Sequence, residues 1–446
     1  MKNISPWAWV PTLYFAEGIP YVLVNTVSVI MFKKMGMSNG DVAMFTGLLY
    51  LPWVIKPVWS PFVDIIRTKR WWTVSMQLLM TAAMLLGALS LPSPDSGTIA
   101  SGNASVSPFM ATLAVFWVTA FASATHDIAA DGYYMLALDQ NRQSFFVGIR
   151  STFYRLATIF GQGVLVFIAG MLESSTGNIP LAWRLTMILC AVIFGAAALY
   201  HTFVLPRPAE DRPHLPHGQG AESARAVFRE FGRTFATFFA KKQIVLGIVF
   251  MLLYRLPEAF LVKMLNPFLL DPAEAGGLGL STEQVGLVYG TVGVAALTAG
   301  GILGGMAASR WGLKKVLWPM ALSLALPCSV FVYLSLALPE NIWVISTCVA
   351  LDQFGYGFGF TAYMLYLIMF SEGEFKTSHY SLCTAFMAMS MMIPGMFAGY
   401  LQEWLGYVDF FWMVMLCCLA TVAVTACIRV DPEFGKKAGS RNDVDK

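Results

Sequence analysis

The sequence predicts an all-α membrane protein in which twelve transmembrane helices form two pseudo-symmetric six-helix bundles. Hydrophobic residues make up 57% of its 446 residues and charged residues only 12%, whereas soluble domains carry roughly 25% charged residues. Stretches of about 20 apolar residues, each long enough to span a bilayer, follow one another along the chain. A motif at the end of the second stretch, beginning at Ser60, also returns in modified form at Gly305.

Apolar stretches give the expected spans and the division of the chain. We expect spans at 8–31, 41–63, 71–91, 108–136, 143–170, 182–205, 243–269, 283–308, 316–338, 341–370, 378–401 and 406–429. The first bundle then covers 1–205, a cytoplasmic linker 206–242, the second bundle 243–430 and a cytoplasmic tail 431–446.

The repeated motif closes one span in each half of the chain. Each copy has a small residue, a polar residue four positions later and a basic cluster just after. Two halves with corresponding parts are typical of alternating-access carriers. We therefore expect the charged residues of both copies to form a cytoplasmic gate: Asp64, Arg67, Lys69, Arg70, Arg310, Lys314 and Lys315.

Basic residues predict the orientation. Of the 29 Lys and Arg residues, only Lys33 and Lys34 fall in loops on the side opposite the termini, and most others lie at the termini or in loops on their side. Cytoplasmic loops are enriched in Lys and Arg, so both termini are expected in the cytoplasm. The net charge of +3 then reports membrane topology, and no nucleic-acid partner is expected.

The linker contains a candidate amphipathic helix. Val227, Phe231, Phe235 and Phe238 recur at spacings of three and four, with arginines between them. An apolar stripe beside basic residues is typical of a helix lying on a membrane surface. We expect this helix, within Ala221 to Lys242, to lie on the inner leaflet.

Charged residues inside the spans are the candidate functional residues. Each costs roughly 2.5–3.5 kcal/mol at mid-bilayer, so such residues usually face a cavity or a partner. Counted from the turn between spans 4 and 5 at about 1.5 Å per residue, Asp131 matches Arg150 in depth and Asp127 matches Arg155. We expect these two ion pairs between spans 4 and 5.

Two interpretations of the pairs remain open. They could simply neutralise charge and fasten the two helices. Alternatively, one carboxylate could lose its partner in one conformation and take up a proton, which would make the proton the coupling ion. Spans 1, 4, 7 and 10 are expected to line a central cavity. The substrate and proton pathway then comprises Glu17, Lys56, Asp127, Asp131, Arg150, Arg155, Tyr254, Arg255, Glu258 and Asp352.

Catalytic and metal-binding patterns are not found in the sequence. The seven cysteines lie within expected spans and lack metal-type Cys-x-x-Cys spacing. A glycine run in span 10, Gly355, Gly357 and Gly359, is interpreted as helix packing, with direct contact to a ligand as the alternative. We therefore expect no catalysis, no metal and no cofactor.

Four stretches resemble the AmpG-type muropeptide permeases of the major facilitator superfamily. They are Glu17-Gly18-Ile19-Pro20-Tyr21, Trp59-Ser60-Pro61 with Asp64, Ala122 to Asp127 continuing to Asp131, and Leu253-Tyr254-Arg255-Leu256 with Glu258. The repeated motif resembles that of the superfamily, with Ser60 in place of glycine and Ser309 in place of the acid.

The resemblance implies a monomeric, proton-driven importer of the bacterial inner membrane that carries anhydromuropeptides or related cell-wall amino sugars. Its expected partners are a small-molecule substrate and the lipid bilayer. A siderophore or other small-metabolite permease is one alternative. A membrane receptor that binds wall fragments without moving them is the other.

Overall fold

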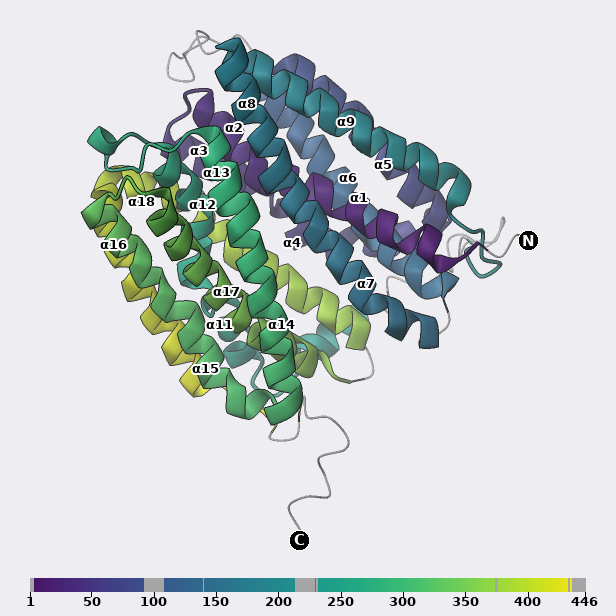
Figure 1. The fold of residues 1–446 in the computed structure, drawn as a ribbon. Helices are drawn as coiled ribbons and strands as arrows, with labels where there is room; N and C mark the ends of the chain where they lie inside the picture. Colours follow the sequence, from purple (N-terminus) through teal and green to yellow (C-terminus); the bar gives the residue numbers. More distant parts are fainter. Residues whose placement is uncertain are drawn as a thin grey trace. The chain divides into compact units, whose positions relative to one another are not determined.

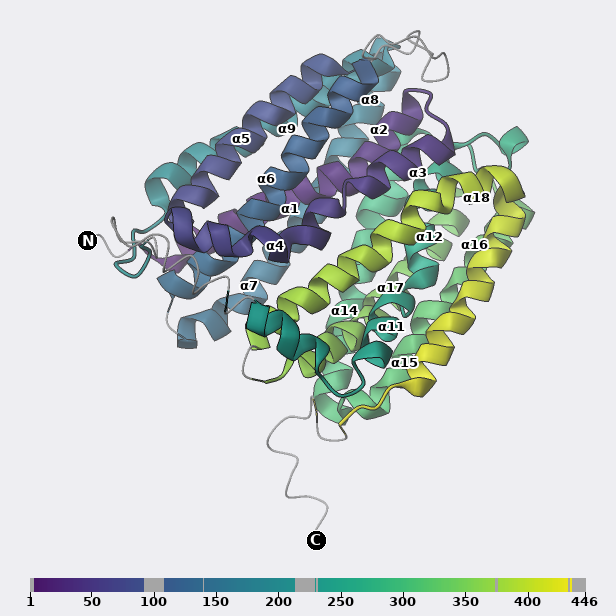
Figure 2. The same cartoon turned by 180° about the vertical axis from the view of Figure 1, so that it is seen from behind.

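The structure is a computed structural model that describes residues 4–91, 108–138, 140–212, 229, 232–373, 376–431 and 434. Within these ranges every regular element is a helix (Figures 1 and 2). The chain forms two compact units. Unit 1 comprises Met1–Arg233 and Ser281–Gly290, and unit 2 comprises Thr234–Leu280 and Thr291–Lys446.

Helices before the linker supply six crossings. After the short η1 (Pro6–Ala8), they are α1 (Val10–Val22) with η2 (Leu23–Val27) and α2 (Ser28–Lys34), then α3 (Asn39–Leu48) with α4 (Leu51–Ile66), then α5 (Lys69–Ser90), α6 (Pro108–Ala137), α7 (Gln140–Ile159) with η4 (Phe160–Leu165) and α8 (Val166–Thr176), and α9 (Ile179–Val204). In both views α5, α6 and α9 run side by side (Figures 1 and 2).

Helices after the linker supply the remaining crossings. They are α11 (Ile244–Leu253) with α12 (Leu256–Leu270), then η5 (Ala273–Ala275), then α13 (Thr282–Val285) with η6 (Gly286–Gly293) and α14 (Val294–Trp311), then α15 (Leu313–Ala325) with η7 (Leu326–Cys328) and α16 (Ser329–Ala337), α17 (Ile342–Ser371) and α18 (Lys376–Cys427).

The number of crossings follows from helix length. Eleven segments of the described chain are long and apolar enough to cross a membrane, and the last, His379–Cys427, has 49 residues. A helix of that length would extend roughly 70 Å, more than twice the thickness of the hydrocarbon core. Gly406, at φ 77° and ψ 168°, breaks it into two. The expected all-α fold with twelve spans is therefore confirmed.

Glycines allow α17 to pack closely in unit 2. A Cβ atom on Gly357 would lie 2.1 Å from the Leu297 carbonyl oxygen of α14, and one on Gly355 would lie 2.1 Å from the Ser323 carbonyl oxygen of α15. Backbone therefore meets backbone on two faces of the helix. These contacts agree with the interpretation of the glycine run as a packing feature.

The amino end of α5 is held within unit 1. The Asp211 carboxylate accepts hydrogen bonds from the backbone N–H groups of Lys69, at 2.6 Å, and Arg70, at 3.0 Å. The Arg70 guanidinium group donates to the carbonyl oxygens of Thr202 and Leu205. The first basic cluster thus ties the end of α9 and the start of the linker to α5.

The end of the linker packs on protein. Phe238 is fully buried in the core of unit 2 and contacts the rings of Phe370, His379 and Phe386. Phe235 packs against the same core. We expected both side chains to lie on the inner leaflet. An apolar stripe shows that one face needs an apolar surface, but it does not distinguish lipid from protein. Val227 and Phe231 lie outside the described residues.

Lys241 anchors the same segment. Its ammonium group donates to the carbonyl oxygens of Phe370 and Glu372, each at 2.7 Å. These are carbonyls of the last turn of α17 and its C-cap, where a cation interacts favourably with the helix dipole. Burial lowers the pKa of the Lys241 ammonium group.

Candidate functional site

Two ion pairs lie at mid-span in unit 1. The Lys56 ammonium group of α4 is paired with the Asp127 carboxylate of α6. One turn further along α6, the Asp131 carboxylate forms an ion pair with the Arg150 guanidinium group of α7, with 3.0 Å between Oδ1 and Nη2. Asp127 and Asp131 are four residues apart and so share a helix face. Three helices are therefore joined through charge.

Aromatic residues complete the second pair. The Tyr14 hydroxyl group of α1 donates to Asp131 at 3.0 Å. The Arg150 guanidinium group lies over the rings of Tyr14, at 4.5 Å, and Tyr134, at 5.2 Å. Cation–π contacts of this kind add to the ion pair. They also fix the direction in which Arg150 points.

One of the two expected pairs is formed and the other is wrong. Asp131 pairs with Arg150, as expected from their depths. Asp127 pairs with Lys56 instead of Arg155. Depth along a helix does not fix direction around it, and five residues turn an α-helix by roughly 140°, so Arg155 points to another side of α7 than Arg150.

The ion pairs are partly open. The side chains of Lys56 and Asp127 are 20% and 21% exposed, and those of Arg150 and Asp131 are 27% and 40% exposed. Ions that face lipid are costly, and intramembrane charges generally face the bundle interior or a water-filled cavity. The arrangement suits a hydrated site that a polar solute or a proton can reach.

Glu17 of α1 adds a third acid to this cluster. The residue is 7% exposed, and its carboxyl group lies within hydrogen-bonding reach of Asp127. Its Oε2 atom makes no hydrogen bond with the described residues. Glu17 and Lys56 were expected on the same pathway, and the structure does place both beside Asp127.

A buried polar network that begins at His126, next to Asp127, was not predicted from the sequence. Gln77 of α5 is hydrogen-bonded through its Nε2 atom to His126 and through its Oε1 atom to His201 of α9, each at 3.0 Å. His201 continues at 3.0 Å to the Thr12 hydroxyl group of α1. All three hydrogen bonds link different helices, so no local spacing in the sequence indicates them.

Unit 2 has a cationic site at a helix break. Between α11 and α12 the chain leaves helical geometry at Arg255, at φ -106° and ψ 15°. The freed Tyr254 carbonyl oxygen accepts a hydrogen bond of 3.0 Å from Thr421. Discontinuous helices at mid-membrane are a feature of transporter binding sites.

The Arg255 guanidinium group is enclosed by aromatic residues of α17. It lies 5.4, 4.6 and 5.6 Å from the ring centres of Tyr356, Phe360 and Tyr363, and it donates to the Tyr356 hydroxyl group. Four residues before Tyr356, the buried Asp352 carboxylate accepts from Gln353 at 3.0 Å. This cage fixes the cation in one orientation.

Two further buried charges follow on α12. Glu258 lies in its first turn and Lys263 in its middle, and both are buried. The charge of Asp352 acts on Glu258. Among its described acids, arginines and lysines, unit 2 therefore buries Glu258, Asp352, Arg255 and Lys263. Lys263 was not among the expected site residues.

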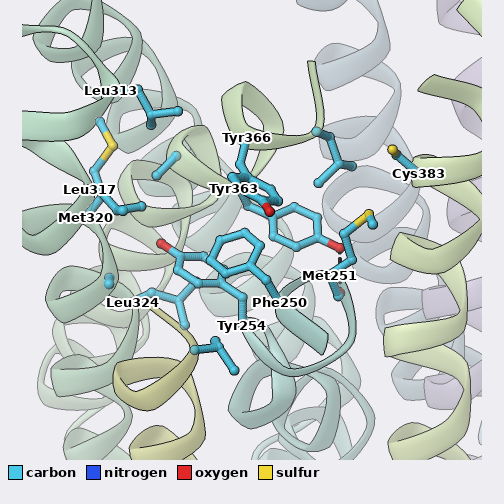
Figure 3. Packing of buried hydrophobic residues seen from close by; sticks show 14 of the residues in the cluster. Phe250, Met251, Tyr254, Leu313, Leu317, Met320, Leu324, Tyr363, Tyr366 and Cys383 are labelled. Carbon is cyan, nitrogen blue, oxygen red and sulfur yellow. Dashed lines mark hydrogen bonds between the residues drawn. The ribbon is translucent and has the colours of Figure 1, made fainter. Parts of the chain in front are cut away.

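Tyr254 packs in the interior of unit 2. It is fully buried in the apolar core of unit 2, against Phe250 and Tyr363 (Figure 3). Its hydroxyl group donates to the Gly359 carbonyl oxygen at 3.1 Å. Neighbouring rings cover Tyr254 and a backbone carbonyl satisfies its hydroxyl group, so its place on the expected substrate and proton pathway stays a prediction.

Most expected gate residues lie at exposed helix ends. Arg67, Arg310, Lys314 and Lys315 are exposed, and the two arginines lie over Trp71 and Trp311, respectively. The Asp64 side chain lies outside the described residues. Among the described residues, no group of His, Cys, Asp and Glu could hold a metal ion.

Comparison with known proteins relates the second half of the chain to one family. Residues 251–444 match the model of the Major Facilitator Superfamily. A POT family transporter in complex with 5-aminolevulinic acid superposes with a TM-score of 0.71 over 94% of each chain, at 11% identity. The second half of the chain therefore resembles this superfamily, and the chain has the fold of the solved transporter.

Two relatives are similar over most of the chain. The anhydromuropeptide permease of Escherichia coli (strain K12) is 24% identical over 412 residues, which cover 90% of this chain and 74% of the permease. The putative transporter AmpG 4 of Rickettsia conorii is 23% identical, covering 92% and 94% of the two chains.

Proposed function

We propose that this protein is a secondary transporter that imports anhydromuropeptides, or related cell-wall amino sugars, across the bacterial inner membrane together with protons. The observation that carries the proposal is the mid-span cluster of unit 1, where three acids and two bases meet. A buried group that can gain or lose a proton is what coupling to a proton gradient needs. Similarity to the Escherichia coli permease supports the choice of cargo.

Recognition of the cargo follows from the same residues. Muramyl compounds carry a carboxylate, acetamido groups and ring hydroxyls. Arg150 and Arg255 each offer guanidinium donors, which suit carboxylates, and both are framed by tyrosines. Arg155 is a third candidate for binding the cargo. Aromatic faces beside polar groups are common linings of small-molecule sites.

Orientation and gating complete the proposal. Both termini lie in the cytoplasm, and two bundles alternate in opening the site to either side. Arg67, Arg310, Lys314 and Lys315 take part in the cytoplasmic gate, together with Asp64. Lys69 and Arg70 contribute by holding α5 to the start of the linker.

Counterflow in proteoliposomes tests the cargo. Vesicles loaded with unlabelled N-acetylglucosaminyl-anhydro-N-acetylmuramic acid should take up the labelled disaccharide, and a large excess of the same compound outside should abolish the signal. Xylose, free N-acetylglucosamine and a ferric siderophore serve as competitors. The proposal requires that the disaccharide competes best.

Two results would contradict the proposal in different ways. If only the siderophore competes, the proposed cargo is wrong, but the proposal that the protein is a carrier stands. Saturable binding of the disaccharide to the purified protein, without counterflow, would indicate a receptor that does not move its ligand.

A further inference from the structure

The charges of the unit 1 cluster do not balance. Lys56 is paired with Asp127 and Arg150 with Asp131, which uses both bases. Glu17 lies beside Asp127 in the same cluster and adds a third acid. Arg155, the other base of α7, turns to a different side. If every group were ionised, the cluster would hold one surplus negative charge inside the membrane.

The contact between Glu17 and Asp127 places the missing proton. Two carboxyl groups within hydrogen-bonding reach of each other are not both ionised without strong repulsion. Asp127 is already neutralised by the ammonium group of Lys56. The remaining carboxyl group, on Glu17, is the more buried of the two.

We propose that Glu17 holds the transported proton, as a carboxylic acid that donates a hydrogen bond to the Asp127 carboxylate. This assignment rests on the proposed proton-coupled function and names its titrating group. The sequence alone left open which acid takes up the proton, and it favoured Asp127 or Asp131.

Groups around Glu17 define what its ionisation does. Facing it are Tyr14 on α1, Lys56 on α4, Asp127 and Asp131 on α6, and Arg150 and Tyr154 on α7. When the O–H bond of Glu17 breaks, the proton leaves to water and the carboxylate keeps the electron pair. Lys56 then faces two carboxylates instead of one.

This change links proton release to movement. An ionised Glu17 competes with Asp127 for Lys56, and Lys56 joins α4 to α6. The bond between these helices is therefore weakened when the proton leaves and restored when it returns. Water that reaches the cluster stabilises the ionised Glu17 carboxylate. Release of the proton is therefore favoured in a conformation that opens the site to water.

Infrared spectroscopy tests the assignment without any cargo. Full-length protein in lipid vesicles at neutral pH should show a protonated-carboxyl C=O band that shifts in D₂O. Glu17→Gln should remove one carboxyl's share of this band. Lys56→Met leaves three acids with one base, so it should increase the band. Glu274→Gln, an exposed acid of η5, serves as the control and should leave the spectrum unchanged.

Transport provides the second arm. Glu17→Gln should retain counterflow of the anhydro-disaccharide but lose accumulation driven by an imposed pH gradient. A carboxyl band that persists unchanged in Glu17→Gln would overturn the assignment whatever the cargo is. Intact gradient-driven accumulation in that variant would overturn it as well. If wild-type protein shows the Glu17 band but no counterflow, the cargo is wrong and the proton site stands.

Discussion

At the scale of single residues, the Lys56–Asp127 pair makes a sharp prediction. Lys56→Met leaves the partly buried Asp127 carboxylate without its cation, and an acceptor that loses its partner in such a site costs about 1–3 kcal/mol. The variant should therefore unfold at lower temperature in detergent. The double variant Lys56→Met, Asp127→Asn should regain stability because neither charge remains, yet it should not regain gradient-driven uptake. Equal stability of the single variant and the wild type would contradict the ion pair.

Gln77 supports a second prediction at this scale. Gln77→Leu removes the buried amide that bonds both histidines, and it leaves a nitrogen atom of His126 and of His201 unsatisfied. We expect a loss of about 1–3 kcal/mol, measured as a lower melting temperature. Thr125→Val is the control, because the Thr125 hydroxyl group bonds only within its own helix, to Phe121. Matching melting curves for the two variants would contradict the network.

Sequence reasoning identified residues better than it identified partners. It selected the mid-span acids and bases because charge in hydrocarbon is costly wherever it occurs. It assigned Asp127 to Arg155 because depth can be counted along a helix, whereas direction depends on helix packing. The Gln77 network escaped detection for a related reason, since one glutamine and two histidines far apart in the chain form no pattern.

At the scale of helices, close packing of α14 on α17 predicts sensitivity to small changes. Gly357→Ala places a methyl group against the Leu297 carbonyl oxygen, and neither backbone can move easily. We expect a clear drop in melting temperature, with about 1–3 kcal/mol for overpacking. Gly305→Ala in α14 is the matched control, because its Cβ position has nothing within 4 Å. An equal drop in both variants would contradict the packing.

Asp211 predicts how the linker acts on its neighbouring helix. Asp211→Ala removes the acceptor of two N–H groups at the start of α5, a loss comparable to that of a helix cap, about 0.5–2 kcal/mol. Hydrogen exchange should become faster at Lys69 and Arg70. Glu210→Ala, an exposed neighbour, should leave exchange unchanged. Unchanged exchange in Asp211→Ala would show that the linker does not hold α5.

Helices themselves were predictable, and their contacts less so. Twelve apolar stretches marked the crossings because length and hydrophobicity suffice for a membrane helix. The linker stripe was also visible, but Phe238 packs on protein. The burial of Tyr254 likewise depends on rings contributed by α11 and α17.

At the scale of the whole molecule, the central claim is that a proton and a wall sugar cross the membrane together. Purified protein in vesicles that contain a pH-sensitive dye tests it most directly. Addition of the anhydro-disaccharide outside, without any imposed gradient, should acidify the vesicle interior in proportion to sugar uptake. Glu17→Gln should abolish acidification while exchange continues. Sugar uptake with no movement of protons in the wild-type protein would contradict the account.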